Sequence, residues 1–411
     1  MPIWKKNLIV CWFGVFVTSV GLSQIAPILP LYIRQLGVTG TSSVAQLSGF
    51  TYGATYIILA VFSPVWGHAA DRFGRKPMLL RASFGMAAVI FGMGLVPNIC
   101  ALIALRLLQG TVAGYTTACT TLLATQVDQG HAGYALGALS TAEIAGSLFG
   151  PVLAGSIDEA LGIRPVFFLT SAFLMVAFFT TLFFVEENFV REEQKTASIR
   201  DVWSILPEKG LTGALFVAFF AINLGLFTIE PIVTEYVKLL TNDSSHVALI
   251  SGCVFSVSGV SSVLAAPQLG KLSDEIGAHK IILISLIAAG LFFLPQAFVK
   301  NPWQLLGLRF LLGFTIAGLN PSVSTLIKKV TPPRLTGRVF GIIMSAAYLG
   351  AFGGSVAGGQ IAAAYGIPTV FVLTSSVMLL CAVLVYFKIF LKLQKQTAVN
   401  RKEDQAASFF P

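Results

Sequence analysis

The chain has 411 residues, of which 55% are hydrophobic and only 11% are charged. Soluble domains carry about 25% charged residues, so this composition excludes an ordinary soluble enzyme or binding domain and indicates a membrane protein. The formal net charge of +9 would suggest a nucleic-acid partner only if the bases formed one exposed patch. They lie instead at the borders of apolar segments, so no nucleic-acid partner is expected.

Twelve apolar segments are each long enough to cross a bilayer, which takes about 20 residues. They begin near Asn7, Gln46, Leu79, Ala101, Ala135, Pro165, Leu211, Val247, Ile281, Gln304, Phe340 and Pro368. The first is longer than the apolar core of a signal peptide and lacks a small-residue cleavage site, so we expect it to remain as a helix. The predicted fold class is an all-α integral membrane protein with twelve transmembrane helices.

Basic residues predict the orientation of the chain. Of the 27 lysines and arginines, only Arg34, Arg164, Lys238 and Lys300 fall in odd-numbered loops, whereas most lie in even-numbered loops and at the termini. Lysine and arginine accumulate in cytoplasmic loops. We therefore expect both termini on the cytoplasmic side.

A short charged segment, residues 67–76, joins the second and third apolar segments, and we call it the hinge. Its notable residues are Gly67, Asp71, Arg72, Gly74, Arg75 and Lys76. Glycines and bases can cradle a phosphate, but the chain has no G-x-x-x-x-G-K-[ST] sequence, so nucleotide-driven transport is not expected. Another interpretation is that the bases only orient the helices in the membrane.

The hinge resembles the signature G-x-L-a-D-r-x-G-r-[KR] of the major facilitator superfamily, with Ala69 in place of the usual leucine. The resemblance implies a transporter whose two halves rock about a central site. It also implies that the hinge residues named above form a gate. In this gate Asp71 meets the amino-terminal end of the eleventh helix near Gly337. A helix dipole favours an anion there, and the contact would close the cytoplasmic side.

The second half of the chain repeats the first at an offset of about 203 residues, which indicates two related structural units. The offset places Pro64, Gly67, Asp71, Gly74 and Arg106 on Pro267, Gly270, Asp274, Gly277 and Arg309. The repeat predicts two pseudo-symmetric six-helix bundles. Ala278 and His279 replace Arg75 and Lys76, so a second gate at Asp274 is expected to be weaker.

The repeat also predicts the domain limits. Residues 1–185 form the amino-terminal bundle and residues 211–395 the carboxy-terminal bundle. Residues 186–210 form a cytoplasmic linker, which is either a helix at the membrane surface or a plain tether. Residues 396–411 form a cytoplasmic tail, which we expect to be disordered from Arg401.

Ionisable residues inside the apolar segments are candidates for proton coupling, because a charge in the membrane interior is costly and usually functional. Glu143 and Glu230 are the only acids well inside these segments, and Arg106 lies in a sequence that resembles the family's R-x-x-q-G motif, which is associated with proton coupling. The alternative is structural: Arg106 bound by backbone carbonyls, and acids that snorkel or hydrogen-bond within the protein.

Small residues in the fifth segment form a second motif. Gly146, Gly150, Pro151 and Gly155 resemble the antiporter motif g-x-x-x-G-P-x-x-x-G, which in the family distinguishes exporters from uptake carriers. The alternative is that small residues at helical spacing simply let helices approach closely.

Several polar side chains are candidates for lining a substrate cavity. They are Gln24, Tyr115, Asn223, Arg309 and Asn320. The five cysteines and four histidines have no spacing typical of a metal site, so no metal and no cofactor is expected.

Over its whole length the chain resembles the twelve-helix drug:proton antiporter branch of this superfamily. The resemblance implies a monomeric exporter in a bacterial inner membrane that moves lipophilic or amphipathic small molecules, such as drugs or toxic compounds, in exchange for protons. The alternative is a carrier of the same fold for a specific metabolite or siderophore. A membrane enzyme or a receptor belongs to another class, but the chain lacks a polar constellation suited to catalysis.

Overall fold

The computed structural model describes residues 2–127, 129–187, 189, 209–241, 246–331, 336–392 and 394. Within these residues all regular structure is helical, and twelve spans are long and apolar enough to cross a membrane. Each span overlaps one predicted segment, so the predicted fold class is confirmed. The tail predicted for residues 396–411 and most of the linker predicted for residues 186–210 lie outside the described residues.

The amino-terminal half consists of the six spans that the sequence predicts. Its helices are α1 (Ile3–Ser23), α2 (Ile25–Gln35), α3 (Thr41–Phe73), α4 (Arg75–Leu95), α5 (Ile99–Val112), α6 (Tyr115–Gln126), α7 (Gln129–Leu161) and α8 (Ile163–Phe184). The first span is prolonged by α2 beyond Gln24. The fourth span is interrupted before Gly114, whose φ of +115° ends the regular α-helical geometry.

The carboxy-terminal half repeats this arrangement. Its helices are α10 (Lys209–Ile229), the 3₁₀-helix η1 (Glu230–Ile232), α11 (Val233–Leu240), α12 (Val247–Ile276), α13 (Ala278–Gln296), α14 (Pro302–Ile316), α15 (Leu319–Val330), α16 (Thr336–Tyr365), α17 (Ile367–Val385) and the π-helix η2 (Tyr386–Phe390). The break after Ile229 corresponds to the break at Gln24.

Equivalent glycines make the tight turns in both halves. Gly74 and Gly277 end the second span of each half, and Gly162 and Gly366 end the fifth. All four have positive φ, between +86° and +101°. Side chains with a Cβ rarely adopt this conformation, so glycine allows one helix to follow another almost without a loop. The turns keep neighbouring spans antiparallel and adjacent.

The two halves meet along two helix pairs, α3 with α16 and α7 with α12. Glycines allow the close approach: a methyl group at Gly359 would lie 2.6 Å from the carbonyl oxygen of Ala45, and one at Gly155 would lie 2.6 Å from that of Ala248. The internal repeat relates these two contacts to each other. In a membrane, close packing of small residues is a main source of helix association.

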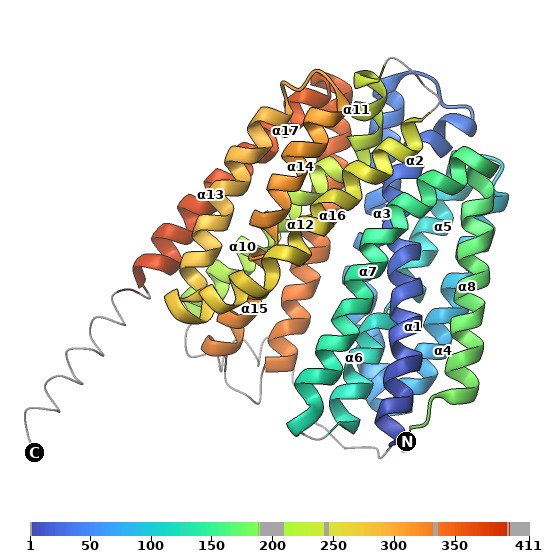
Figure 1. Cartoon of the computed structure of the whole chain (residues 1–411), viewed down its shortest axis with the longest axis vertical. Helices are drawn as coiled ribbons and strands as arrows, with labels where there is room; N and C mark the ends of the chain where they lie inside the picture. Colours follow the sequence, from blue (N-terminus) through green and yellow to red (C-terminus); the bar gives the residue numbers. More distant parts are fainter. Residues whose placement is uncertain are drawn as a thin grey trace, which may run out of the picture.

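The two ends of the bundle differ. Figure 1 shows α2 and α11 at the end opposite the N-terminus, and we call this the outer end. The N-terminus and the hinge lie at the other end, the hinge end. There, a methyl group at Gly67, Gly137, Gly270 or Gly341 would meet nothing within 4 Å. The described residues thus pack tightly between the halves at the outer end and leave space around these four glycines at the hinge end.

Candidate functional site

The hinge is the turn between α3 and α4. The Arg75 guanidinium donates a hydrogen bond to Asp71 at 2.6 Å, and the Asp71 side chain is 62% exposed. The guanidinium of Arg72 lies 5.3 Å from the ring centroid of Phe73. The ion pair of Asp71 is therefore formed within its own half. The side chains around Gly337 lie outside the described part of the chain, so a contact of Asp71 with that helix end stays a prediction.

The first helical turn of α4 is bound by a residue that the sequence analysis did not single out. The Glu187 carboxylate accepts hydrogen bonds from the backbone N–H groups of Arg75 and Lys76, both at 2.7 Å. The first N–H groups of a helix have no partner within the helix, and a carboxylate also complements the helix dipole. A methyl group at Gly74 would lie 2.9 Å from Glu187, so glycine also leaves room for this contact.

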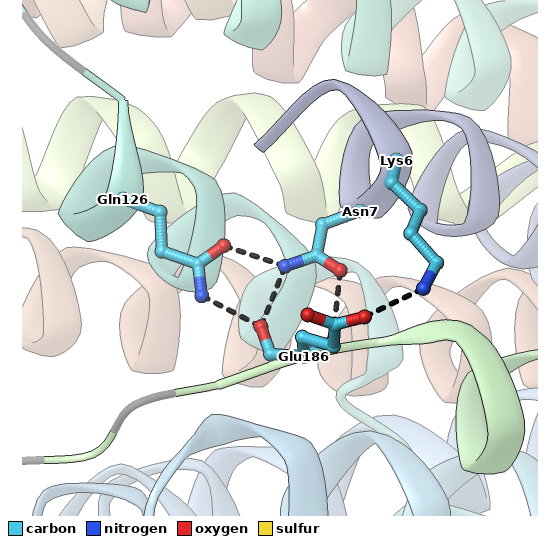
Figure 2. A network of polar contacts seen from close by, with 4 residues as sticks. All are labelled: Lys6, Asn7, Gln126 and Glu186. Carbon is cyan, nitrogen blue, oxygen red and sulfur yellow. Dashed lines mark hydrogen bonds and ion pairs between the residues drawn. The ribbon is translucent and has the colours of Figure 1, made fainter. Parts of the chain in front are cut away.

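Figure 2 shows the polar network beside this contact. The Asn7 side-chain amide donates to the Gln126 side chain and to the backbone carbonyl of Glu186, both at 2.7 Å. The Lys6 ammonium lies 2.6 Å from the Glu186 carboxylate, and this hydrogen bond, together with the positive charge, lowers the pKa of Glu186. We call Glu186 and Glu187 the strap, because they fasten the start of the predicted linker to α1, α4 and α6.

The second predicted gate lies at the turn between α12 and α13, where Gly277 has a φ of +101°. The side chain of Asp274 lies outside the described part of the chain. Its role in gating stays a prediction.

Arg106 is buried in α5 and bound by the neighbouring helix. Its Nε donates to the Thr51 carbonyl at 3.2 Å, its Nη2 to the Tyr52 carbonyl at 3.0 Å, and its Nη1 to Gln109 at 2.5 Å. Backbone carbonyls thus satisfy this arginine, as in the structural alternative. The described contacts do not pair it with Glu143 or Glu230.

Arg309, the equivalent residue in α14, has a different environment. Its side chain is 5% exposed, and its Nε and Nη2 have no hydrogen-bond partner among the described residues. It interacts electrostatically with Glu230 of η1. Leu312 stands where Gln109 stands beside Arg106, which removes one acceptor. The structure therefore gives Glu230 a counter-charge in Arg309 rather than in Arg106.

Aromatic side chains from both halves meet next to Glu230. We define the aromatic cluster as Tyr52, Tyr56, Phe227 and Tyr348. The ring of Tyr56 in α3 lies 5.0 Å from Phe227 in α10 and 6.5 Å from Tyr348 in α16, measured between centroids. The Arg106 guanidinium lies 5.5 Å from the ring centroid of Tyr52, and Tyr52 and Tyr56 both lie close enough to Arg106 and Glu230 to feel their charges. The cluster thus connects Arg106 in one half to Glu230 in the other.

Glu143 approaches the same region from α7. Its side chain is exposed along the helix and interacts electrostatically with Tyr348 of the other half. The structure therefore brings the three proton-coupling candidates around the aromatic cluster. Their role in proton transfer stays a prediction.

The predicted cavity residues have mixed environments. Gln24 accepts a hydrogen bond from Thr170 at 2.8 Å, and the Tyr115 hydroxyl lies 2.8 Å from that of Thr181. The side chains of Gln24 and Tyr115 are buried, and their hydrogen bonds join α8 to other parts of the amino-terminal half. Asn223 donates to a carbonyl of its own helix. The side chain of Asn320 lies outside the described part of the chain. In that part, no group of three or more His, Cys, Asp and Glu could hold a metal ion.

The motif in α7 packs against two different helices. A methyl group at Gly146 would lie 2.5 Å from the Phe16 carbonyl oxygen of α1, and one at Gly150 would lie 2.9 Å from that of Val20. Gly155 and the carbonyl of Pro151 contact α12 of the other half. The motif therefore provides close packing, both within its half and between the halves, and its link to export stays a prediction.

An ion pair across the outer end contains a buried acid that the sequence analysis did not indicate. Arg34 of α2 donates to both carboxylate oxygens of Glu235 in α11, at 2.9 Å and 2.5 Å. The Glu235 side chain is only 1% exposed, so it is more buried than Glu143 or Glu230. Glu235 lies near the end of an apolar segment, and its partner is 201 residues away, so sequence spacing gave no signal for this pair.

Comparison with known sequences identifies the family. The family model of the Major Facilitator Superfamily matches residues 11–259 and 215–411. The multidrug resistance protein MdtG of Salmonella dublin is 42% identical over 381 residues, which covers 92% of this chain and 94% of that protein. MdtG of Salmonella typhimurium is similar to the same extent.

Solved structures share the fold. The nucleoside transporter NupG has a TM-score of 0.75 and 15% identity, over 94% of this chain and 99% of that one. The human organic anion transporter MFSD10 has a TM-score of 0.70 and 17% identity, over 94% of this chain and 100% of that one. At these identities the likeness concerns the fold alone.

Proposed function

This chain belongs to the major facilitator superfamily, and we propose that it exports amphipathic drugs or toxic compounds in exchange for protons, by alternating access. The similarity to MdtG, a multidrug resistance protein, supports drugs as the class of compound that is exported. The distribution of bases supports a location in a bacterial inner membrane with the hinge end in the cytoplasm. In that orientation the structure is closed at the outer end, and we propose that a monomer is the transporting unit.

One observation carries the mechanism: Glu230 has its counter-charge Arg309 in its own half and lies near the aromatic cluster, which joins the two halves. A carboxylate keeps its charge beside an arginine, and in an apolar site without a counter-charge it takes up a proton. Aromatic side chains provide the adaptable apolar lining typical of small-molecule sites. Uptake of a proton by Glu230 would release Arg309 within the same half and change the contact of Glu230 with Tyr52 and Tyr56 of the other half, and so couple the proton to the movement of the halves.

The hinge acts as the cytoplasmic gate in this proposal. Asp71 exchanges its partner Arg75 for the amino-terminal end of α16 when the hinge end closes. The carboxylate would then complement the helix dipole. Arg72 and Lys76 contribute to the same gate, and Asp274 to its weaker counterpart.

Proton release from inside-out vesicles with an acidic interior tests the proposal. Lipophilic compounds are added outside, and the interior pH is followed for the native chain, Glu230→Gln and Glu143→Gln. We expect release with the native chain and its loss in Glu230→Gln, because Glu230 has the arginine partner. Loss in Glu143→Gln alone would move the proton site to Glu143.

Two other outcomes would contradict the proposed function. Compounds that move without proton release would show a uniporter or a different coupling ion. Movement of a metabolite or siderophore without any export of lipophilic compounds would show the alternative carrier. Glu230→Asp is the matched control, because it shortens the side chain and keeps the carboxylate.

A further inference from the structure

We propose that Arg34 and Glu235 form a latch that holds the outer end shut, and that breaking this pair is a required step in opening the transport path outward. The latch joins the halves directly, because Arg34 lies in α2 and Glu235 in α11. Burying a carboxylate is costly unless it is paired and hydrogen-bonded. Arg34 supplies two charge-assisted hydrogen bonds in the bidentate geometry that makes such pairs strong.

Two tyrosines make the latch sensitive to the separation of the halves. The Tyr32 hydroxyl donates to the Met93 carbonyl of α4 at 2.6 Å, and the Tyr236 hydroxyl donates to the Gln296 carbonyl of α13 at 2.9 Å. Each latch helix is thus fastened to the third span of its own half. When the halves rock, α2 and α11 move apart with them, and the ion pair must break.

The surroundings of Glu235 exclude water in the closed form, whereas the Arg34 side chain is 24% exposed. The Thr234 hydroxyl, next to Glu235, donates to the Pro27 carbonyl of α2 at 2.8 Å, and both groups are buried. The glycine contacts at Ala45 and Ala248 lie to either side of the pseudo-symmetric interface. Opening would hydrate Glu235, so the latch has two stable settings: paired and dry, or separate and hydrated.

A second ion pair between the halves provides a contrast. Glu159 of α7 contacts His246, just before α12, and forms an ion pair with it when the histidine is protonated; their side chains are 31% and 56% exposed. Exposed ion pairs contribute little, because water already solvates both charges. Of the two pairs, only Arg34–Glu235 buries its carboxylate almost completely, so we expect only this pair to favour the closed form strongly.

The inference rests on the alternating access of the proposed function but not on the identity of the substrate. Its test measures distances between spin labels in lipid nanodiscs without any substrate, so a failure of drug-driven proton release would not affect it. One pair of labels replaces Leu95 and Phe298 at the outer end, and another replaces Tyr134 and Leu272 at the hinge end; all four residues are exposed. The native cysteines are replaced by serine, and the background is accepted if it retains transport.

Arg34→Met leaves Glu235 buried without a partner, which strongly destabilises the closed outer end. We expect the ratio of outward-open to outward-closed molecules to rise at least about tenfold, which corresponds to about 1.4 kcal/mol. The outer distance should lengthen and the hinge-end distance should shorten. Glu235→Gln should have a smaller effect, because a neutral amide costs less to bury than an unpaired carboxylate.

Matched controls separate the latch from general charge effects. Lys238→Met removes a base at the position of α11 equivalent to Arg34, and Glu159→Gln removes a carboxylate from the exposed pair. Both should leave the distances unchanged. The exchanged pair, Arg34→Glu with Glu235→Arg, should return the distances toward those of the native chain.

Several outcomes would overturn the latch. Unchanged distances in Arg34→Met and in Glu235→Gln would do so, as would an equal shift in Lys238→Met. Loss of proton release in Glu235→Gln with native distances would make Glu235 a proton carrier instead. If Arg34→Met does not fold, the exchanged pair decides: native distances support the latch, and a largely open outer end refutes it.

Discussion

Arg106 and Arg309 occupy equivalent positions in the two halves, but only Arg106 is bound by backbone carbonyls. Arg106 donates to Thr51 and Tyr52 of α3, whereas Arg309 faces Glu230 and has two buried nitrogens without an acceptor. The same residue type is thus hydrogen-bonded to backbone in one half, whereas in the other it faces a carboxylate and has two nitrogens without an acceptor among the described residues. The two halves share a backbone arrangement, but the partners of this arginine differ between them.

This difference predicts opposite consequences for two substitutions. Arg106→Met should lower the free energy of unfolding by about 1.5–3 kcal/mol for each lost hydrogen bond to the charged group. Arg309→Met should lower it less, because Nε and Nη2 lose no partner and Glu230 can take up a proton when its counter-charge is removed, but it should impair transport. Thermal unfolding in detergent and vesicle transport measure the two effects. Equal destabilisation by both variants would contradict this account.

Close packing at the outer end should be sensitive to a single methyl group. Gly155→Ala places that group 2.6 Å from the Ala248 carbonyl oxygen of the other half. We expect it to push the outer ends apart and to increase the outward-open population in spin-label distances. Gly137→Ala, on the same helix, meets nothing within 4 Å and should instead stabilise the helix by up to about 1 kcal/mol. An outward shift in Gly137→Ala as well would refute the steric explanation.

The strap should stabilise the hinge. Glu187→Ala removes the acceptor of two N–H groups at the start of α4. Loss of such a cap costs about 0.5–2 kcal/mol. Hydrogen exchange of the amides of Arg75 and Lys76 should therefore accelerate. Glu186→Ala is the control, because its carboxylate binds Lys6 and not these amides; equal acceleration in both variants would exclude a capping role.

The hinge carboxylate should favour closure of the hinge end. Asp71→Asn removes the negative charge that would complement the dipole of α16, so the resting population should shift further toward molecules open at the hinge end. Spin-label distances between Tyr134 and Leu272 measure this shift. Distances that match those of the native chain would exclude Asp71 from the gate.

The pH dependence of the strap follows from Glu186. Its hydrogen bond from Lys6 lowers its pKa below the ordinary value of 4.5. The ionised form therefore stabilises the fold above that pH, and the contribution disappears as the pH falls through the lowered pKa. The melting temperature of the native chain should exceed that of Lys6→Met near neutral pH, and the small difference should vanish in acid. A difference that grows with acidity would refute this sign.

The sequence alone was sufficient for the twelve spans and for the repeat, because both depend on local properties. A span requires about 20 apolar residues in a row, and a repeat shows itself when the chain is compared with itself. Turns at positions such as Gly74 and Gly277 can be predicted from the sequence for the same reason, since a sharp turn between helices favours glycine. The hinge was found from its own residues, without reference to any other part of the chain.

Only the tertiary structure decided which charges face each other. It placed Glu230 beside Arg309 instead of Arg106, joined Glu235 to Arg34 across 201 residues, and brought Glu187 to the start of α4. These partners come from different spans. Their pairing depends on the rotation of each helix about its axis, on the breaks at Gln24 and Ile229, and on how the two halves pack against each other. An electrostatic contact depends on distance in space, which the order of residues along a chain does not specify.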